Sequence, residues 1–272
     1  MERRSLIESL GAWLLTAVMC VAWCWPAPAD AISFTASSGN RKAHVTFEAS
    51  GTTLIVTLEN LGGDVLAPTD VLTAVFFKIG DAPVLTPSEA KLTAGSTVVF
   101  ATTPPGTDPG GVVGGEWAYV SSANPTPLAD PNNIAGRQGI SSSGFGVFGN
   151  PNFPGSNLQN PLALDGLQYG ITSKNDNPST GNTPVTGRQA LIKYGVEFTL
   201  TGLPTTGPLR VTDVGFQYGT ALNEPYLPGE PEEPREPVPP QIPEPGTLLL
   251  LGSGLSGLAA CRRQARSFTP GA

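Results

Sequence analysis

The sequence predicts an all-β fold for residues 32–225, an antiparallel β-sandwich of the jelly-roll or immunoglobulin-like kind. Glycine and proline are abundant, at 33 and 28 residues of 272, and only 14% of the residues are charged. That composition favours short strands and many turns over helices. Several stretches alternate apolar and polar residues, and none holds a helical period. We expect helices only at the two ends, a signal helix before the sandwich and a short hydrophobic helix after it.

The first 31 residues have the pattern of a signal peptide. After a basic start, an apolar run extends from Leu10 to Trp25, and Ala29-Asp30-Ala31 has the small-x-small pattern that signal peptidase cleaves. We expect the cut after Ala31, with Ala29 and Ala31 as its recognition residues. The mature chain then begins outside the cytoplasm at Ile32.

The first half of the body contains two expected hairpins and a central strand. Residues 42–48 and 52–59 alternate on either side of Ser50-Gly51, which indicates a hairpin. Residues 71–79 are apolar enough for a central strand. Residues 90–94 and 97–101 flank Gly95-Ser96 and predict a second hairpin.

The second half is expected to hold four further strands, at residues 116–120, 167–172, 189–201 and 209–218. Of these, residues 189–201 form the longest alternating run. Residues 121–163 show little periodicity, and unstructured loops of that length are either functional or flexible.

Charge and cysteine content exclude several function classes. The formal net charge of −7 gives no electrostatic support for a nucleic-acid partner. Cys20 and Cys24 lie in the leader, without a convincing lipoprotein motif, and Cys261 lies near the C-terminus. The body therefore offers no disulfide, cysteine-metal site or thiol nucleophile.

A catalytic or metal site in the body has little support. His44 is the single histidine, and its alternation with Val45 and Phe47 places it on the exposed face of a strand. No nucleophile-elbow motif accompanies it. The sequence therefore predicts a plain surface position, no catalytic residue, no bound metal and no cofactor.

Three other groups of residues suggest alternatives. Asp165 and Asn175-Asp176-Asn177 offer oxygen ligands for Ca²⁺, but they also suit a turn before Pro178. Five aromatic residues on strands could stack on sugars or fill the core, and three carboxylates could form a glycosidase pair if they lay close together. The aromatic residues are Trp117, Tyr119, Tyr169, Phe216 and Tyr218, and the carboxylates are Glu116, Glu197 and Asp213.

The C-terminal region has an extended linker followed by a short apolar run. Residues 226–242 are rich in proline and glutamate, which favours extended chain. The run that follows would cover about 21 Å as a helix, less than the ~30 Å hydrocarbon core, so we expect a provisional anchor. In order, the segment comprises the sorting motif Pro243, Glu244, Pro245 and Gly246; the membrane residues Thr247, Leu248, Leu249, Leu250, Leu251, Leu255 and Leu258; and the basic stop Arg262 and Arg263.

Residues 243–266 resemble the PEP-CTERM sorting signal, whose tail segment is also called the ice-binding protein C-terminal domain. The nine residues after Arg263 are more than the signal usually has. The resemblance implies processing by exosortase, an integral-membrane cysteine transpeptidase of Gram-negative bacteria. It also implies a transient inner-membrane anchor, followed by release to the cell surface or extracellular matrix. The alternative is an ordinary C-terminal tail anchor.

The body has a resemblance of its own, carried by GGEWAY at 114–119, DGLQYGITS at 165–173 and FQYGT at 216–220. These segments look like a family of exosortase-dependent surface proteins. The two resemblances together imply an exported, noncatalytic surface or matrix protein, connected with exopolysaccharide and biofilm, with extracellular polysaccharide as a further partner. The alternative function is a carbohydrate- or calcium-binding adhesion module.

Overall fold

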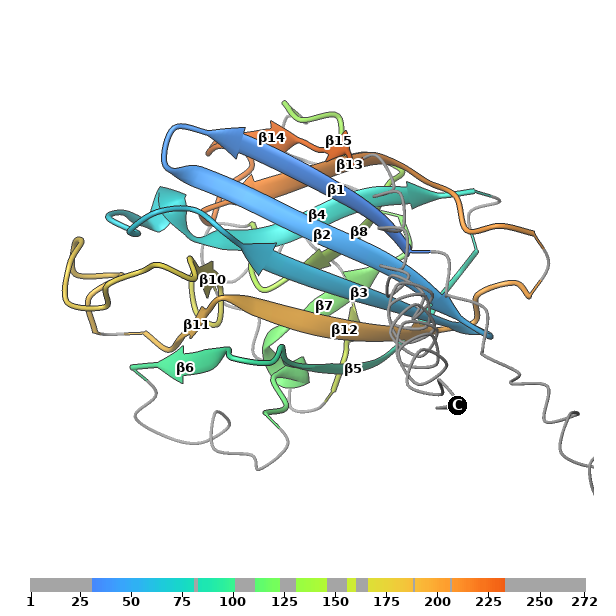
Figure 1. Ribbon diagram of the computed structural model, residues 1–272, viewed down its shortest axis with the longest axis horizontal. Helices are drawn as coiled ribbons and strands as arrows, with labels where there is room; N and C mark the ends of the chain where they lie inside the picture. Colours follow the sequence, from blue (N-terminus) through green and yellow to red (C-terminus); the bar gives the residue numbers. More distant parts are fainter. Residues whose placement is uncertain are drawn as a thin grey trace, which may run out of the picture. The chain divides into compact units, whose positions relative to one another are not determined.

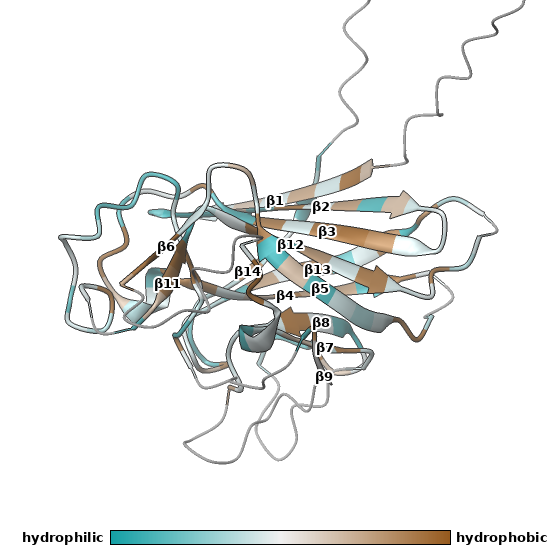
Figure 2. Cartoon of the chain, turned by 90° about the horizontal axis from the view of Figure 1, so that it is seen from below, coloured by the Kyte–Doolittle hydropathy of each residue, from teal (hydrophilic) through white to brown (hydrophobic). Residues whose placement is uncertain are grey.

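The hairpin predicted from alternation at residues 42–59 is present. In the computed structural model, β2 (Arg41–Ser50) and β3 (Thr53–Asn60) pair antiparallel around Gly51, whose φ of 60° favours glycine. Alternate side chains are buried from Ala43 to Phe47 and from Leu54 to Asn60, and Figure 2 shows the hydrophobic residues of these strands. The structure describes residues 31–80, 83–100, 111–122, 131–145, 156–159, 166–187, 189–205 and 207–232. The signal helix, Ala29 and the whole PEP-CTERM-like segment lie outside these ranges.

The hairpin is the centre of a six-stranded sheet (Figure 1). All adjacent strands of this sheet pair antiparallel. Its edge strand β15 is short. In spatial order the sheet contains β15 (Glu230–Pro231), β1 (Ala31–Ser38), β2, β3, β12 (Gly195–Thr201) and β5 (Thr86–Leu92).

The second sheet is built around β4, the predicted central strand, which is buried on both faces. It is antiparallel apart from the parallel pair β10–β11. Its main path is β6 (Thr97–Val99), β11 (Leu191–Lys193), β10 (Ile171–Thr172), β4 (Leu72–Ile79), β8 (Gln138–Ser141), β7 (Ala118–Val120) and β9 (Ser156–Asn157), and β13 (Val211–Tyr218) and β14 (Tyr226–Pro228) extend the sheet from β4.

The main core lies between the two sheets, which confirms the β-sandwich. The ring of Phe47 on β2 packs 4.9 Å from that of Phe77 on β4, and Trp117 packs 4.9 Å from Phe198 on β12. Within the described residues the helices are limited to two short 3₁₀ turns, η1 (Pro68–Asp70) and η2 (Gly114–Glu116). None of the helices described there is long and apolar enough to cross a membrane.

The second predicted hairpin is wrong. Strands β5 and β6 belong to different sheets, and the chain crosses between them at residues 93–96. The Ser96 amide donates to the Thr93 carbonyl at 3.0 Å, and Gly95 has a φ of 84°. A tight turn of glycine and serine can connect two strands of one hairpin or two strands in different sheets. The residue types in the turn therefore did not distinguish these two arrangements.

The predicted strand at residues 189–201 is divided at Tyr194, which has a φ of 96°. Its amide donates to Thr172 of the second sheet, and its carbonyl accepts from Asn60 of the first. One residue thus moves the chain from β11 to β12. The adjacent Gly195 has no room for a Cβ, which would lie 2.9 Å from the Leu58 carbonyl oxygen.

Two regions predicted to lack strands contain them. Strand β8 falls within residues 121–163 and is buried along its length, so its sequence Gln-Gly-Ile-Ser shows no alternation. Residues 226–232, expected to begin the linker, form β14 and β15, which pair with β13 and β1. We call residues 226–232 the C-terminal strap. The Glu232 amide donates to Ser33 at 2.9 Å, so the folded part extends beyond the predicted boundary at 225.

A fragment of residues 32–232 is therefore expected to be more stable than one ending at 225. The shorter fragment loses the β14 and β15 pairing and the hydrogen bond that Arg137 donates to the Tyr226 hydroxyl at 2.6 Å. We expect urea denaturation to show a loss of about 2 kcal/mol. Both fragments should be β-rich by circular dichroism and unaffected by reductant, since neither contains cysteine. Equal unfolding midpoints would contradict the role of the strap.

Candidate functional site

His44 lies on the outer face of the six-stranded sheet, between two carboxylates. The register of β2 places it opposite Glu59 of β3 and Thr35 of β1. Its Nδ1 is 3.1 Å from Glu59 Oε2, and its Nε2 is 3.5 Å from Glu232 Oε2. The imidazole is only 19% exposed. The predicted outward face of the strand is confirmed, but the plain surface position is wrong, because the side chain is held in an ion-pair cluster.

The electrostatics of this cluster favour a charged imidazole. The hydrogen bond to Glu59 raises the pKa of His44 above its usual value, and the charge of Glu232 adds to the effect, whereas burial opposes it. The same hydrogen bond lowers the pKa of Glu59, and a further one from Tyr194 acts in the same direction. The ammonium of Lys174 lies 4.4 Å from the centre of the Tyr194 ring. We call His44, Glu59, Glu232, Tyr194 and Lys174 the His44 cluster.

The five strand aromatics proposed as a sugar-stacking surface lie inside the protein. Each is at most 3% exposed, so none presents a ring face to solvent. Burial raises the pKa of Tyr119 to about 12, and it raises that of Tyr218 further. This part of the carbohydrate-binding hypothesis is therefore wrong; the buried residues are Trp117, Tyr119, Tyr169, Phe216 and Tyr218.

The segment proposed for calcium forms turn contacts. Asp176 is 5% exposed and accepts a hydrogen bond from the Val65 amide at 3.0 Å, while Asn175 donates to the Gly62 carbonyl. Asn177 Oδ1 accepts from the Ser179 amide. Asp165 lies outside the described residues. Within the described ranges, no group of three or more His, Cys, Asp or Glu side chains is placed to hold a metal ion.

The three carboxylates considered for glycoside hydrolysis are not brought together as a pair. Glu197 is on β12 of the first sheet, with Oε1 3.1 Å from Lys91 Nζ. Asp213 is on β13 of the second sheet, with Oδ2 2.8 Å from Lys78 Nζ. Glu116 is buried in η2. Each of the two strand carboxylates is thus neutralised by its own lysine.

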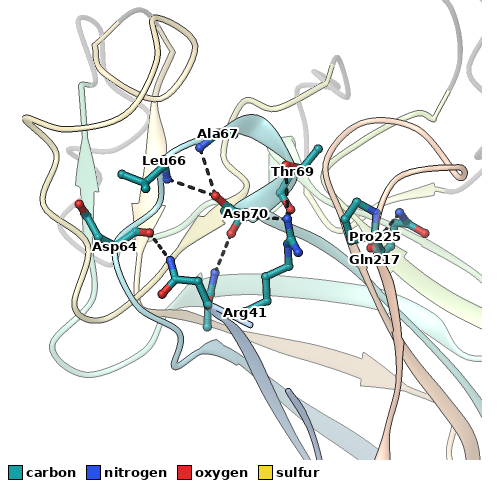
Figure 3. A network of polar contacts seen from close by, with 10 residues as sticks. Arg41, Asp64, Leu66, Ala67, Thr69, Asp70, Gln217 and Pro225 are labelled. Atoms are coloured by element: carbon teal, nitrogen blue, oxygen red, sulfur yellow. Dashed lines mark hydrogen bonds and ion pairs between the residues drawn. The ribbon is translucent and has the colours of Figure 1, made fainter. Parts of the chain in front are cut away.

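A polar network fixes the connection between β3 and β4 (Figure 3). Asp70 is 2.8 Å from the Arg41 guanidinium and accepts hydrogen bonds from the amides of Leu66 and Ala67. Arg41 also donates to the Thr69 carbonyl at 2.7 Å. These contacts satisfy backbone groups of the connection, so the network has a structural explanation.

The motifs behind the family resemblance of the body are structural as well. In FQYGT, Gln217 is fully buried, and its amide nitrogen donates to carbonyls of the β13–β14 turn, including Pro225 at 3.3 Å. Its Oε1 accepts from Asn132 at 3.0 Å. In DGLQYGITS, a Cβ on Gly170 would lie 2.6 Å from Val71. These contacts give both motifs a role in the fold.

A shallow groove lies at the end of the sandwich beside the β2–β3 turn, with a volume of about 320 Å³. It is lined mainly by glycine, proline and aliphatic residues of residues 203–210 and of the ends of β2 and β4. Arg210 is the single charged residue among those lining it. The lining residues that the structure describes therefore include no acid–base pair.

The clearest functional feature comes from comparison with known families. The PEP-CTERM protein-sorting motif matches residues 241–264, which include the predicted Pro243-Glu244-Pro245-Gly246 element, the leucines and both arginines. The motif confirms the predicted sorting signal and supports an exported protein that an exosortase sorts. Neither the curated proteins nor the solved structures show a significant match to the chain.

Proposed function

We propose that this protein, which carries a PEP-CTERM sorting motif, is a noncatalytic component of the cell surface or extracellular matrix of a Gram-negative bacterium. Signal peptidase cleaves off the leader and so creates the mature N-terminus. The C-terminal apolar run then holds the protein briefly in the inner membrane, until exosortase removes that run. The observation that carries the proposal is the motif at residues 241–264.

The folded domain is suited to a structural role. Its conspicuous aromatic residues fill the core, and three of its candidate acidic residues, Asp176, Glu197 and Asp213, are engaged with lysines or a backbone amide. The two ring nitrogens of His44 face carboxylates, those of Glu59 and Glu232. These contacts support a domain that presents a surface, because a nucleophilic triad requires a hydroxyl or thiol beside the base.

The proposed partner outside the cell is the extracellular polysaccharide of a biofilm. Ser33, Thr46 and Thr57 form a row of half-buried hydroxyl side chains across β1, β2 and β3. Such hydroxyls both donate and accept hydrogen bonds, as sugar hydroxyls do. Ser33 and Thr46 share a hydrogen bond of 3.0 Å, so this face supports contact with a hydrated polymer through a few weak polar interactions.

Deletion of the exosortase gene in the native host tests the proposal. The protein should then accumulate in the inner-membrane fraction with its tail attached, and it should be lost from the matrix fraction that contains polysaccharide. A complemented strain is the control, and both changes should revert. An unchanged distribution between fractions would contradict the proposed route.

A further inference from the structure

The end of the C-terminal strap, residues 230–232, is held to the sandwich by few contacts, one of which is made within the His44 cluster, whereas β14 pairs with three residues of β13. Strand β15 has only two residues, which pair with Phe34 and Thr35 of β1. The next residue, Glu232, adds one backbone hydrogen bond to Ser33 and one side-chain contact to His44. Residues 230–232 are therefore an edge whose closure depends on single interactions.

The arrangement of nitrogens and carboxylates makes the Glu232 contact dependent on protonation. An imidazolium ring has two N–H donors, and each nitrogen of His44 faces one carboxylate. A neutral ring keeps one donor and presents a lone pair to the other carboxylate. The contact to Glu59 is the shorter, at 3.1 Å against 3.5 Å, so the remaining proton stays there. Loss of the second proton thus leaves Glu232 facing a lone pair.

We propose that His44 is a proton-controlled latch that fastens the end of the C-terminal strap, residues 230–232, through Glu232 and releases it when the imidazole becomes neutral. Release would free residues 230–232 and add roughly 9 Å of extended chain to the segment that follows the domain. This inference concerns the closure of the sandwich and does not depend on how the tail is processed.

The charged and titratable groups around His44 determine the pH range in which the latch is closed. Glu59 and Tyr194 lie on the β3 side, with Lys174 behind the Tyr194 ring. Glu232 lies on the strap side, where Glu230 is opposite Thr35, and Lys42 precedes His44 on its own strand. Since the folded-state pKa of His44 is raised, the latch is fully closed below about pH 6.5 and opens as the pH rises through that folded-state pKa.

NMR on the exported protein can test the latch, because the chain has a single histidine and its ring resonances are unambiguous. Between about pH 5 and about pH 9, the hydrogen-exchange protection of the Glu232 amide should fall roughly fivefold with the same midpoint as the His44 titration. The protection of Val56, inside the β2–β3 hairpin, should not change, and it serves as the internal reference.

Variants distinguish the proposed latch from a general effect of pH on the protection of the Glu232 amide. Glu232→Gln should lower the pKa of His44, and His44→Gln should give weak protection of the Glu232 amide at every pH. Glu48→Gln, on the same face of β2, should leave both the titration and the protection unchanged. The proposal is overturned if protection at Glu232 is independent of His44 protonation, or if its pH dependence persists in His44→Gln.

Discussion

Replacing Trp117 with alanine is expected to lower the free energy of unfolding of the sandwich by about 3–5 kcal/mol. Trp117 is fully buried, and its ring contacts Phe198 of the opposite sheet. Truncation would remove this contact and leave a cavity that the paired strands cannot close. Because domains of this size are stable by about 5–15 kcal/mol, much of the stability would be lost. Urea denaturation of residues 32–232 measures the effect.

Trp117→Phe is the matched control. The indole Nε1 has no hydrogen-bond partner among the described residues, so replacement by a phenyl ring sacrifices no hydrogen bond there. We expect a loss below roughly 1.5 kcal/mol. Equal losses for the alanine and phenylalanine variants would show that the ring does not connect the sheets as described.

Glu244→Ala is expected to abolish processing of the tail in the native host. Glu244 is the single charged residue of the Pro243-Glu244-Pro245-Gly246 element, and the flanking prolines favour the extended form that a protease-like cleft binds. The variant should remain in the inner-membrane fraction with Arg262 and Arg263 still attached. Fractionation followed by mass spectrometry measures the change.

Glu236→Ala removes a nearby glutamate outside the motif and should be processed like the wild type. Replacement of Arg262 and Arg263 by glutamate should have a different effect, because these cations favour the cytoplasmic side. It should disturb membrane retention before processing. Loss of processing in Glu236→Ala as well would indicate a requirement for linker charge instead of a requirement for the motif.

Local pattern predicted the elements whose burial is visible in their own sequence. The β2–β3 hairpin and the core strand β4 follow from alternation and apolar density. The same hairpin register places Glu59 opposite His44, so this half of the cluster could have been found from the sequence. The contact with Glu232 could not have been found in this way. Glu232 follows β15, whose pairing with β1 joins the two ends of the domain.

Two of the errors share a physical cause: the chain changes sheets at positions where the local sequence does not reveal the change. Gly95 and Tyr194 mark two such crossings. Strand β8 is enclosed on both faces, which removes the alternation on which strand prediction relies. Aromatic residues on strands fit the core and a sugar-binding face equally well, and only burial distinguishes these uses.

The intact mass of the protein recovered from the extracellular matrix of the native host tests the central claim most directly. The account predicts a chain that begins at Ile32 and ends before the leucine-rich run, so that Cys261 and Arg262 are absent. A matrix-associated wild-type protein that retains Cys261 and Arg262 would contradict the assignment of the C-terminal segment as a processed sorting signal.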